Sequence, residues 1–160
     1  MLNFAPKLSE MSLYSCVVLI HVFSAILGMG PGFVMIYIVK QARNMEELRH
    51  AYLIRNKLHI FVMIGGTLLL LSGITMGTLN PYWWKQGWYV TSLALFLIAL
   101  SFGPLVLAPK SKPIKQFLSE YQESEIPEEY YRKANQLFFY ERLENVIFLI
   151  IIVLMILKPF

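Results

Sequence analysis

The sequence contains no aspartate and only one cysteine, and charged residues make up 15% of its 160 positions. The single cysteine, Cys16, excludes an intrachain disulfide and a paired-cysteine metal or redox motif. With 57% hydrophobic residues, the chain also has too few polar side chains to cover a soluble domain of this length. These shortages predict an integral membrane protein.

The signature motifs of common soluble enzymes are missing as well. The sequence has no phosphate-binding loop, no HExxH zinc helix and no GxSxG nucleophile turn. The basic residues that produce a formal net charge of +4 flank apolar runs instead of forming one basic patch, so no nucleic-acid partner is expected. The sequence therefore assigns no catalytic residue.

Long apolar runs are what the sequence has in abundance. A helix of about 20 apolar residues crosses the ~30 Å hydrocarbon core of a bilayer. Spans are predicted over residues 13–39, 58–79, 88–107 and 136–157, with polar connections at 40–57 and 108–135. The predicted fold class is therefore all-α, with one polytopic membrane domain over residues 1–160 arranged as an antiparallel bundle of four transmembrane helices.

Local signals add detail to the connections. Apolar residues at helical spacing within 40–57 indicate a helical hairpin at the surface. Residues 109–125 are predicted to form a polar loop, and Pro127 suits the first turn of a helix that continues to Leu157. The turn after the second span is expected to place an aromatic belt at the membrane interface, made of Tyr82, Trp83, Trp84, Trp88 and Tyr89.

The distribution of lysine and arginine predicts the orientation. One side holds Lys40, Arg43, Arg49, Arg55 and Lys57 in the first connection, and Lys110, Lys112, Lys115, Arg132 and Lys133 in the third. The other side holds only Lys7, Lys85 and Lys158. Because short loops rich in these residues stay in the cytoplasm, both termini are expected outside.

The first span contains the most unusual segment of the chain, HVFSAILGMGPGF. Pro31 removes a backbone donor and its ring crowds the preceding turn, so a break in the helix is expected there. Gly28, Gly30 and Gly32 surround the proline, and His21 shares a helical face with Gly28 and Gly32. Exposed backbone is not tolerated in lipid, so this face is predicted to contact neighbouring helices.

Two histidines are the candidate ligands for a cofactor or metal. Counting residues from the ends of the spans puts His21 and His59 in opposite leaflets, so they are not expected to ligate one haem iron together. The separate candidates are Met76 or water beside His21, and Met35 beside His59. The cofactor considered is a b-type haem, with copper as the other metal.

His59 shares a helical face with Gly66, Gly73 and Gly77, which are predicted to form a groove for a flat macrocycle or a neighbouring backbone. The alternative is that both imidazoles are structural and form hydrogen bonds with helix carbonyls or with hydroxyl groups such as that of Ser24. Ionisable groups deep in a membrane are functional more often than those in soluble cores, so both hypotheses stay open.

A second polar cluster lies at the start of the last apolar run. Its members are Arg55, Glu141, Arg142, Glu144 and Asn145. A pair of Glu144 with Arg55, or of Glu141 with His59, is predicted as a buried contact, and Arg142 is expected to extend toward the headgroups. The cluster is either an interfacial anchor or a site for an ion, a proton or a quinone.

The segments HVFSAILGMGPGF, LHIFVMIGGTLLLLSGITMG and PLVLAPKSKPIK, with the tryptophan turn between the last two, resemble an uncharacterised bacterial family of predicted four-span integral membrane proteins. The resemblance covers residues 13–115 and implies a location in the bacterial cytoplasmic membrane, without an activity. His21 and residues 28–32 are also similar to copper-resistance D proteins and to HemJ-type protoporphyrinogen oxidase. The acidic and basic companions of a porphyrin-oxidising site are not evident at matching positions, so that activity is not transferred.

Three functional hypotheses follow. In the first, the bundle holds a b-type haem, or handles haem or copper, for membrane electron transfer or respiratory-enzyme assembly. In the second, the chain is a non-catalytic accessory or scaffold subunit whose small-residue faces dock onto a larger membrane complex or a second copy. A transporter or proton path is the third, and the absence of an inverted repeat disfavours it.

Overall fold

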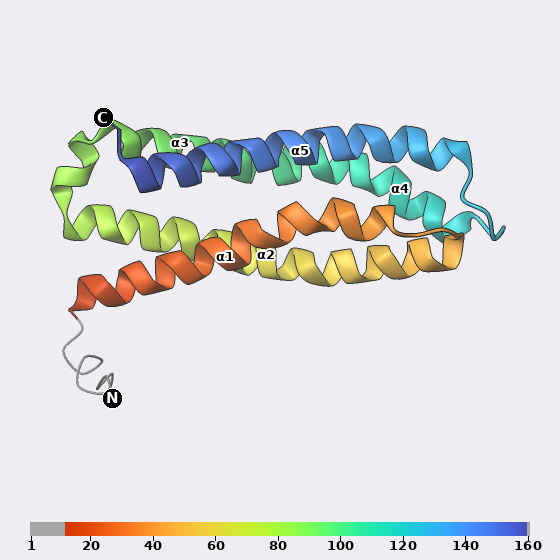
Figure 1. Cartoon of the computed structure of the whole chain (residues 1–160), viewed down its shortest axis with the longest axis horizontal. Coiled ribbons are helices and arrows are strands. Elements are labelled where there is room, and N and C mark those ends of the chain that lie inside the picture. Colours follow the sequence, from red (N-terminus) through yellow and green to blue (C-terminus); the bar gives the residue numbers. More distant parts are fainter. Residues whose placement is uncertain (1–11, 160) are drawn as a thin grey trace.

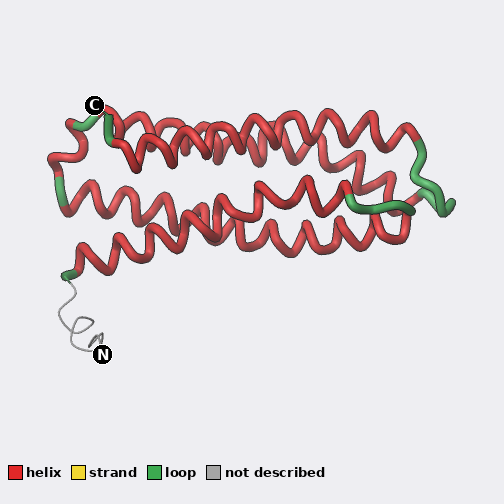
Figure 2. Tube along the Cα trace, viewed as in Figure 1, coloured by secondary structure: helices red, strands yellow, loops and turns green. Residues whose placement is uncertain are grey.

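The computed structural model describes residues 12–159, which form four long helical rods and short connections. The rods are α1 (Leu13–Lys40), α2 (Met45–Leu79), a composite of α3 (Gly87–Phe102), η2 (Gly103–Leu107) and α4 (Ala108–Glu120), and α5 (Glu128–Leu157). Neighbouring rods run antiparallel (Figure 1), and the loops lie only at the two ends of the bundle (Figure 2). The predicted all-α fold class is confirmed.

The lengths and compositions of these rods suit a membrane. Three of them, Leu13–Lys40, Met45–Leu79 and Gly87–Glu120, are long and apolar enough to cross a bilayer. In α5 the continuously apolar part is shorter and begins at Val146. It packs beside α3 at the same depth, because Phe148 and Ile151 share a core with Phe96 of α3. Large apolar side chains such as Phe23 and Ile156 face outward, where lipid would cover them.

The two ends of the bundle differ in character. The tryptophan end contains the short helix η1 (Pro81–Lys85), and the charged end contains the connections 41–44 and 121–127. At the tryptophan end Trp88 and Tyr89 are buried whereas Tyr82 and Trp84 are exposed, so part of the expected aromatic belt belongs to the core. The ammonium of Lys158 lies 5.3 Å from the centre of the Trp88 ring, which attaches the end of α5 to this cluster.

The first connection is shorter than predicted because α2 begins at Met45. The Asn44 side chain accepts a hydrogen bond from the backbone amide of Glu47, and the Glu47 carboxylate accepts one from the amide of Arg43. This reciprocal capping satisfies amides that would otherwise be unpaired at the helix start. Met45 and Leu48 are fully buried, so most of the predicted surface hairpin is a full-length helix with its own core.

The polar loop predicted over 109–125 is wrong, because α4 extends to Glu120. Ile114 and Leu118 are buried in the core of the charged end, and this burial stabilises helix despite the prolines and lysines around them. The Arg49 guanidinium of α2 also donates hydrogen bonds to the carbonyls of Leu118 and Tyr121, where α4 ends. The final helix begins after Pro127 and ends at Leu157, as predicted.

The two intramembrane prolines have different effects. The break predicted at Pro31 is absent, because α1 continues as one helix from Leu13 to Lys40. Contacts on both sides of this proline support the helix: Gly28 packs on α2, and Asn145 of α5 donates a hydrogen bond to the carbonyl of Gly32. At Pro104 the helix instead widens into a π turn, η2, which accommodates the missing amide.

Candidate functional site

His21 lies in the half of the bundle nearer the tryptophan end, and its partner is on α2. The Nδ1 atom is 2.9 Å from the Ser72 hydroxyl, and that hydroxyl lies 2.6 Å from the carbonyl oxygen of Leu68. A serine has one proton to donate. When the Ser72 hydroxyl donates this proton to the carbonyl of Leu68, its oxygen accepts a hydrogen bond from Nδ1–H of His21. The neutral ring then keeps its lone pair on Nε2.

Gly73 makes this arrangement possible. A Cβ atom at this position would lie 3.3 Å from Cε1 of His21, so the ring rests directly on the backbone of α2. Tyr89 of α3 donates a hydrogen bond of 2.9 Å to the Gly73 carbonyl. Helices α1, α2 and α3 therefore meet at one glycine, and the partner hydroxyl is that of Ser72. The Ser24 hydroxyl, considered from sequence, bonds the carbonyl of Ile20 in its own helix.

The glycine groove predicted on α2 is filled by protein side chains. A Cβ atom at Gly66 would contact Leu100, and one at Gly73 would contact His21. At Gly77 the occupants are the rings of Tyr89 and Trp84. The macrocycle alternative is therefore corrected, because these glycines accommodate neighbouring groups of the protein. The other alternative, a neighbouring backbone, is confirmed at Gly66, on which the backbone of Gly28 packs.

The structure separates His59 from His21. Ser72, the partner of His21, and His59 are 13 residues apart in α2, which corresponds to about 20 Å along the helix. The two histidines therefore cannot ligate one iron. His59 is exposed on the outside of the bundle, whereas Met35 is buried within it. Met76 is also buried, and it lies one helical turn beyond Ser72.

The second cluster is centred on an ion pair between Arg55 of α2 and Glu141 of α5. The Arg55 guanidinium also lies 5.5 Å from the centre of the Tyr52 ring, and the hydroxyls of Tyr52 and Tyr130 are 3.4 Å apart. Arg55 Nη1 and Glu141 Oε2 are buried without a hydrogen-bond partner. The sequence predicted Glu144 with Arg55, or Glu141 with His59. The observed pair combines Glu141 with Arg55, so neither prediction is confirmed.

The rest of this cluster divides between the inside and the outside of the bundle. The Asn145 side chain donates a hydrogen bond of 3.2 Å to the Gly32 carbonyl and so joins α5 to α1. Glu144 is half-buried, one turn from Glu141. Arg142 is exposed, in the position from which its long side chain can extend toward headgroups.

Comparison with known proteins places this chain in a family. Residues 15–159 match the model of a family described as predicted integral membrane protein (DUF2269). The chain belongs to this family. It is therefore a multi-pass integral membrane protein, in agreement with the three long apolar rods. No curated protein and no solved structure matches it.

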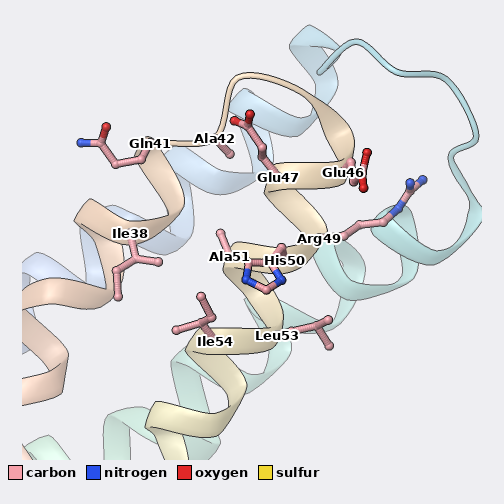
Figure 3. A pocket seen from close by; sticks show the side chains of 10 residues that line it. All are labelled: Ile38, Gln41, Ala42, Glu46, Glu47, Arg49, His50, Ala51, Leu53 and Ile54. Carbon is pink, nitrogen blue, oxygen red and sulfur yellow. The ribbon is translucent and has the colours of Figure 1, made fainter.

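A groove outside both clusters lies where α1 ends and α2 begins (Figure 3), with a volume of about 630 Å³. Its lining combines Glu46, Glu47, Arg49 and His50 with apolar side chains such as Ile38. His50 is exposed, as expected for a residue of the charged connection. Within residues 12–159 no group of three histidine, cysteine or acidic side chains could hold a metal ion.

Several residues that build these sites were not found from sequence. Ser72 contacts His21, and the Tyr52 ring lies beside Arg55. Tyr130 contacts Tyr52, and Gly65 contacts Gly28 across the α1–α2 interface. The sequence did contain one signal. If two antiparallel helices cross at Gly28 and Gly65, His21 and Ser72 lie opposite each other, because each is seven residues from the crossing. That register becomes visible only once the crossing point is known.

Proposed function

We propose that this protein carries a b-type haem, with copper as the alternative, and that His21 is its protein ligand. The observation that supports this proposal is the hydrogen bond between His21 Nδ1 and the Ser72 hydroxyl. Histidines that bind metals nearly always donate their other ring N–H to a protein acceptor, which fixes the ring and directs the free nitrogen. The Ser72 hydroxyl is such an acceptor, because its own proton is engaged by the carbonyl of Leu68.

The donor set favours haem over a bare ion. The described part of the chain has no group of three histidine, cysteine or acidic side chains, so a metal held by several such ligands has no support. A haem iron already has four macrocycle nitrogens and needs only one or two protein ligands. Nε2 of His21 fits that need, and the buried thioether of Met76 is the second candidate, one turn beyond Ser72. Because the stripe from Gly66 to Gly77 is filled, a macrocycle would have to approach the ring from outside that stripe.

A bound haem would supply one-electron chemistry, which suits membrane electron transfer or the assembly of a respiratory enzyme. The protein's contribution is to orient the imidazole through the hydrogen bond with Ser72. The accessory-subunit hypothesis remains the alternative, although two glycines of the small-residue face contact this chain's own helices. Gly28 contacts Gly65 and Gly66, and Gly32 contacts Asn145.

The test is a visible absorption spectrum and a metal analysis of the full chain purified from cells supplied with haem and copper. We expect a Soret band that is lost in His21→Ala and retained in the matched control His59→Ala. Ser72→Ala should keep the band but weaken haem retention about 10-fold to 100-fold. Copper without a Soret band would select the alternative, and absence of both would overturn the proposal.

A further inference from the structure

The exposed face of α4 carries two lysines that form no ion pair with residues 12–159. Lys112 and Lys115 are three residues apart, so they share a helical face, and both are exposed. We call Lys112 and Lys115 the α4 basic patch.

The depth of this patch corresponds to lipid headgroups. Trp88 begins the rod at the tryptophan end, next to the exposed rings of Tyr82 and Trp84, which suit a membrane interface. From Trp88, the ~30 Å hydrocarbon core corresponds to about 20 residues of helix, so it ends close to Ala108. Lys112 therefore lies about 6 Å beyond that boundary and Lys115 about 10 Å beyond it, which is the headgroup layer of the opposite leaflet.

The acidic side chains near this level are engaged elsewhere or sheltered. Among the described residues the ion pairs are Arg55–Glu141 and Glu129–Lys133, so neither lysine of the patch has one. Glu120 accepts a hydrogen bond from Gln116, and Glu144 is half-buried on α5. Within the described part of the chain, the positive charge of the patch is therefore left without an ion-pair partner.

We propose that the α4 basic patch binds the phosphate headgroup of an anionic phospholipid. The two ammonium groups supply positive charge and hydrogen-bond donors for the phosphate oxygens. Lys110 does not belong to the patch, because its ammonium is directed to the ring of Tyr140, 4.7 Å away. This proposal is independent of the haem site, which lies in the other half of the bundle.

The test reconstitutes the full chain in bilayers of phosphatidylcholine with and without phosphatidylglycerol, and native mass spectrometry then measures the lipids retained. The unmodified protein should retain phosphatidylglycerol preferentially. A double variant, Lys112→Gln with Lys115→Gln, should lose about 25-fold in affinity, from about five-fold for each lysine. The matched control removes two exposed cations at the same end, Lys40→Gln with Arg43→Gln, and should keep the preference.

Three results would overturn the proposal. Equal retention of the two lipids would show no anionic site, and equal losses in the double variant and the control would show only general attraction between charges. Inorganic phosphate at matched concentration distinguishes a free anion from a lipid. Displacement of the lipid by phosphate at equal concentration would assign the patch to a soluble anion and contradict the lipid assignment. All substituted side chains are exposed, and an unchanged unfolding temperature verifies that each variant is folded.

Discussion

Arg55 of α2 and Glu141 of α5 form an ion pair that joins the two halves of the bundle, with side chains only 12% and 10% exposed. One half is the hairpin of α1 and α2, and the other is the hairpin of the α3–α4 rod and α5 (Figure 1). Removing two charges from water is costly, and here their mutual attraction is the compensation. The pair therefore contributes to the choice of partner between the hairpins more than to net stability.

Removing one member of this pair should be worse than removing both. Glu141→Leu leaves the Arg55 guanidinium buried without its carboxylate, and we expect a loss of about 3–5 kcal/mol in the free energy of unfolding. The double variant Arg55→Met with Glu141→Leu should recover most of that loss. Unfolding of the purified protein in detergent, followed by tryptophan fluorescence, measures all three. A double variant less stable than either single one would contradict this account.

Substitution of Gly65 should separate α1 from α2. A Cβ atom there would lie 2.7 Å from the Cα atom of Gly28, and a backbone atom cannot rotate away. We expect Gly65→Ala to cost about 3 kcal/mol or more. Gly30→Ala is the matched control on α1, because no atom lies within 4 Å of the added methyl group. The measurement is the unfolding temperature of each variant. Equal values for the two variants would show that the two helices do not touch at this crossing.

The hydrogen bond from Asn145 to the Gly32 carbonyl should have a modest effect on stability. Measured side-chain hydrogen bonds between transmembrane helices average under 1 kcal/mol, so Asn145→Ala should cost about 1 kcal/mol. Val146→Ala, at an exposed position of the same helix, should change stability less. Chemical unfolding in mixed micelles resolves differences of this size. A cost as large as that of Glu141→Leu would mean that Asn145 supports more than this one contact.

Tyr130 should make the charged end sensitive to alkaline pH. Burial raises the pKa of its phenol, so the folded protein keeps the group neutral above pH 10. The unfolded chain ionises near its ordinary pKa of about 10, so the stability contributed by Tyr130 is present below that pH and is lost as pH rises above it. Tyr130→Phe should lessen the fall in unfolding temperature between pH 9 and pH 11. The control is Tyr131→Phe, at the exposed neighbouring position, and its unfolding temperature should fall as much as that of the unmodified protein.

Predictions from sequence were confirmed where the structure of a segment depends only on that segment's own residues. The apolar runs predicted the three rods that are long and apolar enough to cross a bilayer, and Pro127 predicted the start of α5. Both predictions depend only on a segment's own residues and the surroundings it requires. The same reasoning failed over 109–125, where lysine, proline and serine suggested a loop. Helix forms there because Ile114 and Leu118 are buried against residues distant in sequence.

By itself, the sequence determined that this protein is embedded in a bilayer, that it is helical, and which segments are apolar enough to cross. The reason is that the free energy of transfer into lipid is a property of each segment alone. The tertiary structure alone decided which polar groups meet. His21 contacts Ser72 and Glu141 contacts Arg55 because the close crossing of Gly28 and Gly65, with the packing of α5 on α3, sets the register between helices. A shift of one helical turn, about 5.4 Å, would separate every one of these partners, and no single segment encodes that register.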